Sequence, residues 1–163
     1  MAVTFTGPMG KLLDNAEDLL AASSTFQTWV EAETAAAAEA SIHVCSLPGA
    51  SAAWPAAYVM LADALVYNRS SATGFRDTPE GSIAIRIEAE PTSTETSKVE
   101  QEKYFIDKID NVVKEIATLS GTGEYLNCLS ITTQFGDDGS PWERVGHEAT
   151  TLLVAYIILE PAV

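Results

Sequence analysis

A helical pattern at residues 97–120 constrains the fold more than any other feature of the sequence. Its apolar side chains recur every three or four residues and line one helix face, while charged side chains fill the opposite face. Ser97 and Glu100 form a capping box at its start, and Gly121 is placed to end it. A helix of this kind must pack on a second layer. The apolar stripe comprises Phe105, Ile106, Ile109, Val112, Val113 and Ile116.

Strand-like patterns elsewhere in the chain can supply that layer. Residues 82–90 alternate between apolar and polar side chains, which is typical of a strand with one buried face. The segments 41–47, 56–67 and 125–135 are also predicted strands, although a helix is possible at 56–67. Residues 143–160 end in a run that is apolar on both faces, which indicates an interior strand.

Helices are predicted in the N-terminal part, over residues 8–40. Leucines and alanines recur there at helical spacing, and Ser24 with Gln27 resembles a capping box for a short second helix. The element order predicts an α+β fold in a single domain over residues 1–163. We expect a mixed or antiparallel sheet of about four to five strands, packed against one long amphipathic helix and preceded by N-terminal helices.

Acidic residues dominate the charge of the chain. Lys and Arg number 9 against 23 Asp and Glu, which gives a formal net charge of -14. Because nucleic-acid binding depends on basic side chains that neutralise phosphates, the chain is expected to repel a phosphate backbone. The longest apolar run, near residues 152–159, is much shorter than the roughly 20 residues of a membrane span.

The two cysteines indicate neither a disulfide framework nor a zinc site. Cys45 and Cys128 are far apart in sequence, and neither belongs to a C-x-x-C pair. Each lies in an apolar, strand-like run, where a free cysteine is expected to act as a small buried hydrophobe. No basic segment leads into an apolar stretch near Met1, so we expect no signal peptide, and a reducing cytosol fits best.

A search for catalytic, cofactor and metal motifs finds none. His43 lies in an apolar strand, where a structural role is favoured, and His147 is predicted on an exposed edge or loop. Residues 136–141 form a hairpin turn in our interpretation, since their two acids are too few for a calcium loop. We therefore expect no enzymatic activity, no cofactor and no metal.

The polar segment 68–81 is the strongest candidate for an interaction surface. It holds Arg69, Phe75 and Arg76 in a chain with few basic residues, and long loops are often functional. Arginine beside an aromatic side chain is typical of protein interfaces. An ordinary solvated loop remains the alternative. The candidate interface residues are Arg69, Phe75, Arg76, Asp77 and Arg144.

Several patches of the sequence together resemble one known protein family. Residues 19–30 are similar to its opening helix, serine break and Phe-x-x-Trp helix. An alanine-rich stretch leads into Ile42-His43-Val44, as it does before the first strand of the family. Trp54-Pro55 stands where many members have a proline before the next strand, and the outline continues through residues 81–90, 97–120 and 142–158. The family that these patches resemble is the tail terminator proteins of long-tailed bacteriophages.

This resemblance implies a ring, usually hexameric, that caps the tail tube, ends tail growth and joins the tail to the head connector. The implied partners are copies of the chain, the tail tube protein and a connector protein, and DNA passes through without specific binding. The implied location is the virion tail or neck, assembled in the host cytoplasm.

Three alternatives stay open at the sequence level. The chain is compatible with another neck or head-completion protein, or with a non-catalytic cytosolic ligand-binding or regulatory domain. The third alternative is an enzyme with an unfamiliar site around His43, Cys45 and nearby acids.

Overall fold

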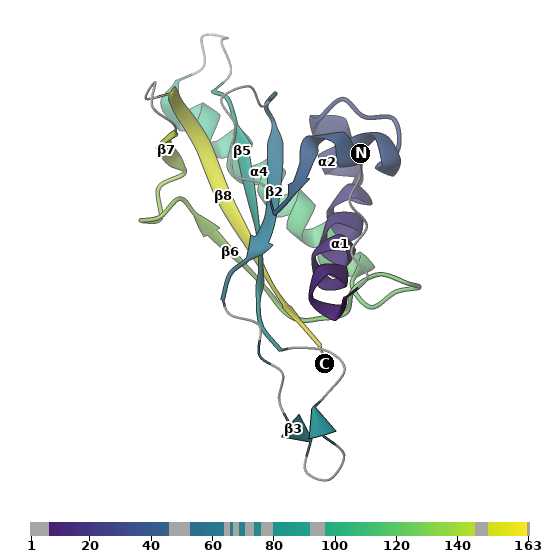
Figure 1. The fold of residues 1–163 in the computed structure, drawn as a ribbon. Coiled ribbons are helices and arrows are strands. Elements are labelled where there is room, and N and C mark those ends of the chain that lie inside the picture. Colours follow the sequence, from purple (N-terminus) through teal and green to yellow (C-terminus); the bar gives the residue numbers. More distant parts are fainter. Residues whose placement is uncertain are drawn as a thin grey trace.

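A computed structural model shows an α+β protein with helices on one side of a single large sheet (Figure 1). It describes residues 7–45, 53–63, 66, 69–70, 74–75, 80–91, 97–145 and 150–162. The helices are α1 (Pro8–Ala21), α2 (Ser24–Trp29), α3 (Ala35–Ala38) and α4 (Lys98–Leu119), with a short 3-10 turn at Glu39–Ser41. The predicted class, the long helix and the N-terminal helices are confirmed.

The main sheet is mixed, and its strands run in the order β1-β2-β5-β8-β6. β1 is parallel to β2, all other pairs are antiparallel, and β7 also pairs with β8. The uncertain segment 56–67 begins with a strand rather than a helix. The strands are β1 (Ile42–Val44), β2 (Ala56–Leu61), β5 (Ile83–Ala89), β6 (Cys128–Phe135), β7 (Trp142–Val145) and β8 (Thr150–Pro161).

The predicted hairpin turn at residues 136–141 is wrong. β6 and β7 do not pair with each other, because both run antiparallel to β8 along the edge that β5 leaves free. Val154 of β8 accepts a hydrogen bond from the Gly136 N–H at 3.0 Å and donates one to the Pro141 carbonyl at 2.7 Å. The residues between them therefore loop out of one interrupted strand, as in an enlarged β-bulge. The predicted strand 143–160 is accordingly two strands, β7 and β8.

Gly136 is required at the start of this loop. Its φ is +56°, a region that favours glycine. A Cβ atom there would lie 1.9 Å from the Ser140 carbonyl oxygen. The turn-forming composition of the segment was therefore correctly recognised, but the path of the following strand was not.

The N-terminal cap of α4 is the predicted residue, whereas the cap of α2 lies one residue earlier than predicted. Ser97 accepts a hydrogen bond from the Glu100 N–H at 3.3 Å, as expected for the start of α4. At α2 the cap is Ser23, which accepts from the Phe26 N–H, and not Ser24. Gln27 instead donates to the Ala21 carbonyl of α1 at 2.7 Å, so its side chain stabilises the end of the preceding helix.

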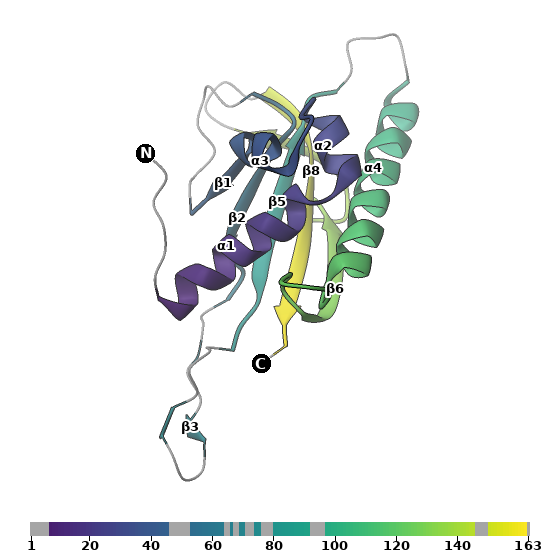
Figure 2. The same cartoon turned by 90° about the vertical axis from the view of Figure 1, so that its right-hand side faces the viewer.

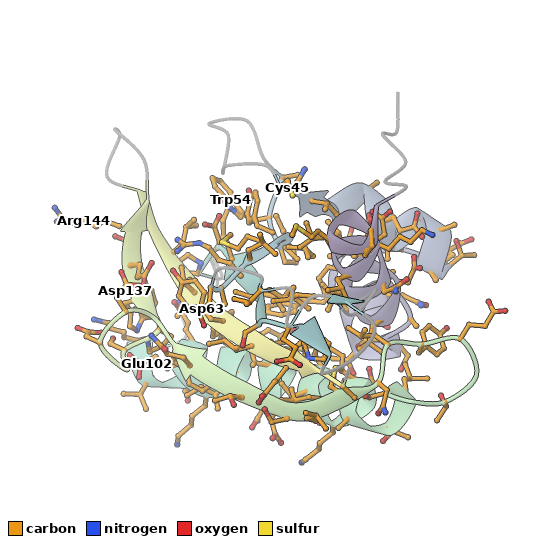
Figure 3. All side chains as sticks on the ribbon, turned by 60° about the horizontal axis from the view of Figure 1, so that its bottom comes forward. Cys45, Trp54, Asp63, Glu102, Asp137 and Arg144 are labelled. Carbon is orange, nitrogen blue, oxygen red and sulfur yellow. The ribbon has the colours of Figure 1, made fainter. Side chains whose placement is uncertain are left out.

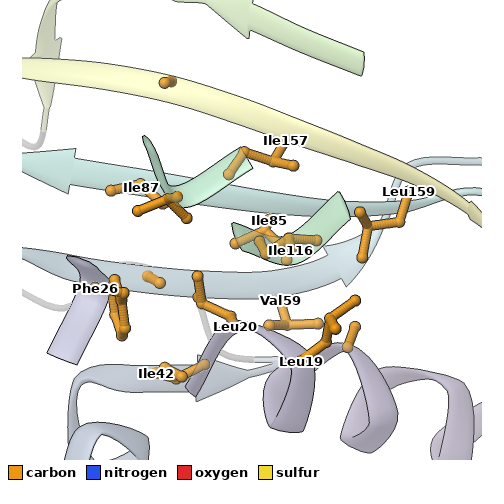
Figure 4. Close-up of a cluster of buried hydrophobic side chains, with 14 of the residues drawn as sticks. Leu19, Leu20, Phe26, Ile42, Val59, Ile85, Ile87, Ile116, Ile157 and Leu159 are labelled. Carbon is orange, nitrogen blue, oxygen red and sulfur yellow. The ribbon is translucent and has the colours of Figure 1, made fainter. Parts of the chain in front are cut away.

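All the described helices lie on one face of the sheet, and the main core lies between these two layers (Figure 2). Alternate strand residues face the helices, including Val59, Ile85 and Ile157. They meet Leu19 and Leu20 of α1, Phe26 of α2 and Ile116 of α4 (Figure 4). Because α1 and α4 cover only this face, the other face of the sheet has to be completed by different means.

Glu115 of α4 ties the long helix to the start of α2. Its carboxylate accepts hydrogen bonds from the Thr25 N–H at 3.0 Å, the Thr25 hydroxyl at 2.7 Å and the Ser24 hydroxyl at 2.9 Å. The Ser23 hydroxyl also donates to it. A helix start has N–H groups without partners within the helix, so this carboxylate caps α2 from another element. Burial raises the pKa of Glu115, but these hydrogen bonds outweigh it and hold the pKa below its ordinary value.

We predict that Glu115→Gln lowers the free energy of unfolding by about 1 kcal/mol at neutral pH, because the charged hydrogen-bond acceptor is lost. A lowered pKa stabilises the fold above the ordinary pKa of 4.5, and this contribution is lost as the pH falls through the folded-state value. The difference from the wild type should therefore shrink in acid. Urea unfolding at neutral pH and at about pH 4 measures it. Glu124→Gln, at an exposed position, is the control; equal effects of the two changes would contradict the capping role.

Candidate interaction surfaces

A two-stranded arm projects from the end of the sheet between β2 and β5 (Figures 1 and 2). Its described parts are Val66, β3 (Arg69–Ser70), β4 (Gly74–Phe75) and Glu80. Val66 and Glu80 exchange two backbone hydrogen bonds of 2.7 Å, and β3 pairs antiparallel with β4. The segment predicted as a loop thus has a regular stem.

The structure brings two of the predicted interface residues together and separates a third. Arg69 and Phe75 are direct cross-strand partners in the arm. Arg144 is exposed on β7, where it pairs with Thr151 near the opposite end of the sheet (Figure 3). Arg76 and Asp77 lie outside the described residues. The candidates therefore belong to at least two separate surfaces.

A row of polar side chains crosses the sheet on the face without helices. The strand register places His43, Tyr58, Arg86, Tyr156 and Gln134 side by side on β1, β2, β5, β8 and β6. The His43 ring stacks on Tyr58 with 5.1 Å between ring centroids. This row was missed from the sequence, because strict alternation in β5 had assigned its polar side chains to solvent.

Arg86 is the centre of a largely buried cluster, which we call the Arg86 cluster. Its guanidinium donates to Glu88 at 2.7 Å, to Glu143 at 3.2 Å and to the Tyr156 hydroxyl. Glu88 is 0% exposed and also accepts from the Trp54 indole at 3.3 Å. With its donors already directed at the chain's own acceptors, Arg86 serves to hold β5, β7 and β8 together.

Burial and neighbouring charges shift the pKa values of Arg86 and Tyr156 in this cluster. Burial lowers the pKa of Arg86, but the Glu88 hydrogen bond, Tyr156, and the Glu88 and Glu143 charges outweigh it, so the net shift is upward. Burial raises the pKa of Tyr156, and Arg86 opposes that shift. The cluster therefore keeps a charged arginine and neutral tyrosines at physiological pH, which favours a structural role over proton transfer.

The prediction that Cys45 is buried within a strand is wrong. Cys45 is exposed and has a φ of +56°, because it follows the last residue of β1 instead of lying inside the strand. His43 does lie in β1 and is half-buried. Cys128 is half-buried at the start of β6, and burial raises the pKa of its thiol. His147 lies outside the described residues.

The described residues contain neither a cluster of metal-binding side chains nor a helix suited to cross a membrane. No three His, Cys, Asp or Glu side chains among them are grouped to hold a metal ion. No helix in the same part of the chain combines the length and apolar character needed to cross a membrane.

Acidic side chains gather where α1 meets Glu39. Burial, followed by the charges of Glu39, Asp14 and Asp18, raises the pKa of Glu17 to about 7. A shallow cavity beside this cluster has a volume of about 400 Å³. Its lining is Asn15, Asp18, Ala21, Ala35, Glu39, Glu124 and Tyr125. Burial of Glu17, together with repulsion from Glu39, Asp14 and Asp18, therefore destabilises the fold when Glu17 is ionised.

We predict that Arg86→Ala lowers the free energy of unfolding by about 3 kcal/mol, because it leaves the buried Glu88 charge without its partner. The double variant Arg86→Met with Glu88→Leu removes both charges and keeps the volume, so its loss should be smaller. Urea unfolding compares them. A double variant at least as damaged as Arg86→Ala would show that the loss in Arg86→Ala does not come from the unpaired Glu88 charge.

We predict that Glu17→Gln stabilises the protein near pH 8 and has little effect near pH 5. A carboxyl whose folded pKa is raised costs stability as the pH rises from its ordinary value of 4.5 to about 7, and the amide avoids this loss. Thermal unfolding at the two pH values tests it, with Glu33→Gln as an exposed control. A variant that gains nothing at the higher pH would show that ionised Glu17 does not destabilise the fold.

Two sequence comparisons with known proteins give no match. No protein-family model matches the sequence, and a search of curated proteins also finds no match. Inferences about function therefore depend on the arm, the sheet and the distribution of charge.

Proposed function

We propose that the protein is a structural subunit of a bacteriophage tail, forming a ring that caps the tail tube, ends its growth and joins the tail to the head connector. The observation that carries this proposal is the arm. The arm projects from the domain, and β3 and β4 place Arg69 directly across from Phe75. A projecting strand pair is suited to contact with another subunit.

A non-catalytic role agrees with the use of the polar side chains. In the Arg86 cluster, the charges of Arg86, Glu88 and Glu143 engage one another. Catalysis needs groups that remain available to a substrate. The resemblance to tail terminators across most of the chain supplies the specific assignment to a tail, with no catalytic residues to transfer.

The net charge suits a ring through which DNA passes. At a formal charge of -14, each subunit repels phosphate groups, and a closed ring repeats this charge with its symmetry. Only carboxylates within the roughly 10 Å screening length of the passage would act on the duplex. A repulsive lining would keep DNA moving instead of binding it by counterion release.

We predict that the purified wild-type protein forms closed rings, visible by negative-stain electron microscopy and with a single mass by native mass spectrometry. Arg69→Glu should weaken assembly about tenfold, because the arm then presents an acid to an acidic partner. The fold should be unchanged by circular dichroism, since the arm lies outside the core.

Lys11→Glu makes the same change of charge at an exposed position on α1, so it provides the control and should leave ring formation intact. A wild-type protein that stays monomeric, alone and with a tail tube protein, would refute the ring. Rings formed equally well by Arg69→Glu would instead remove the arm from the interface.

A further inference from the structure

One side of α4 is apolar and has no helix against it. Val99, Ile106 and Val113 recur every seven residues, so they lie in a row along the same side of the helix. Val99 is 58% exposed, Ile106 is 38% exposed, and Val113 is half-buried. Figure 2 shows α1 and α2 on one side of α4, and no helix of the described residues lies on its other side. The row is therefore open to a partner.

The row lies toward the edge of the sheet and away from α2. Glu115 binds the start of α2 from one side of α4. Ile106 lies on the other side, where it lines a cavity of about 210 Å³ together with Phe135 of β6. β6 ends the strand order β1-β2-β5-β8-β6. Ile106 is therefore placed at the boundary of the domain, where a second molecule can approach it.

Two opposite charges alternate with the apolar side chains of this row. Lys103 follows Val99 by four residues, and Asp110 follows Ile106 by four, so both lie on the same side of the helix. The set of Val99, Lys103, Ile106, Asp110 and Val113, which we call the α4 flank, therefore carries no net charge. The chain as a whole has a formal charge of -14. Since acidic surfaces repel each other, two copies can approach through this neutral flank with little repulsion.

The α4 flank is complementary to itself in an antiparallel pair. A two-fold axis at Ile106 places Val99 opposite Val113, because each lies seven residues from Ile106. The same axis places Lys103 beside Asp110 of the other copy, since these residues lie three and four positions from it. A parallel pair would instead set Lys103 against Lys103 and Asp110 against Asp110. The charges therefore favour the antiparallel arrangement.

The ion pair that Asp110 already forms is compatible with this contact. Lys114 Nζ lies 2.6 Å from one carboxylate oxygen of Asp110, and both side chains are more than half exposed. An exposed pair of this kind within one helix contributes little to stability. The other carboxylate oxygen can accept a hydrogen bond from a second lysine. Lys103 is exposed and can supply it from the other copy.

We infer that two copies of the chain associate through the α4 flank, antiparallel about a two-fold axis at Ile106, with Lys103 of each copy beside Asp110 of the other. Packing of the apolar side chains supplies the affinity, and the ion pairs fix register and orientation. The inference goes beyond the proposed ring and does not depend on it. A two-fold contact cannot close a ring, but it would join two rings into one assembly.

Replacement of Ile106 tests the contact in solution. Ile106→Glu places two like charges at the two-fold axis and should weaken self-association at least about tenfold, as measured by analytical ultracentrifugation. Val99→Glu, at a more exposed position of the same row, should also weaken it, and it replaces Ile106→Glu if that variant does not fold. Tyr104→Glu is the control, because Tyr104 is 52% exposed and lies two residues away, on nearly the opposite side of the helix.

The outcomes separate this contact from the proposed ring. A wild type that stays monomeric, or variants in the row that associate as well as Tyr104→Glu does, would overturn the inference. Two-fold pairs that form without rings would support the inference and refute the proposed function. Rings that Ile106→Glu leaves unchanged would do the reverse.

Cysteine cross-linking of the full chain tests the orientation. In a background of Cys45→Ser and Cys128→Ala, Ile106→Cys should form a disulfide with its own copy, because a residue at a two-fold axis meets itself and a disulfide requires Cα atoms within about 7 Å. Val99→Cys should couple to Val113→Cys in a mixture, but not to itself. Coupling of Val99→Cys to itself would indicate a parallel pair and overturn the antiparallel contact, as would the absence of both expected products.

A charge exchange tests the ion pair between copies. Lys103→Asp alone and Asp110→Lys alone should each weaken association about tenfold, and the double variant should recover most of that loss. Lys114→Ala removes only the pair within the helix, so it is the control and should have little effect on association. Losses that simply add in the double variant would rule out a contact between Lys103 and Asp110.

Discussion

Strand pairing along β8 is the constraint on which the other elements depend. β5 occupies one edge of β8, while β6 and β7 share the other. The strand is buried on both faces over much of its length, as its continuous apolar sequence requires. The backbone of Val154 forms hydrogen bonds with both Gly136 and Pro141, which are the two ends of the loop between β6 and β7. This loop is therefore fixed by β8, although β6 and β7 do not pair with each other. The positions of the remaining strands, and the floor on which α1 and α4 pack, follow from these pairings.

The helices cover only one face of the sheet, so the side chains on the other face are not packed against a helix. The protein uses the Arg86 cluster there, instead of another apolar layer, together with the stacked pair of His43 and Tyr58. Buried charge is costly to desolvate and gains most when its geometry is good and its hydrogen bonds are complete. The cluster therefore does more to fix the relative positions of β5, β7 and β8 than to stabilise the fold.

Local patterns in the sequence predicted local structure well, and long-range pairing accounts for what they missed. The helix at 97–120 and the strand at 82–90 follow from periodicity, which depends on near neighbours. The pairing of β7, the strand after Gly136, could not be predicted. β7 pairs with β8 and not with β6, and the turn residues between β6 and β7 do not determine that pairing. Arg69 and Phe75 were found from composition. The Arg86 cluster was missed because alternation identifies a polar face without showing whether it is buried, although Arg86 and Glu88 two positions apart were a usable signal.

Basic residues are scarce in this chain, so their positions determine which surfaces can attract an acidic partner. Several of the nine are engaged within the chain: Arg86 with Glu88, Lys114 with Asp110, and Lys98 with the Trp142 ring. Arg69 lies in the arm, and Arg144 is exposed on β7. Two identical acidic surfaces repel each other, whereas a basic residue on one copy can approach acidic residues on another. In the proposed ring, the excess of acid therefore disfavours symmetric contacts between like surfaces more than head-to-tail contacts between different surfaces.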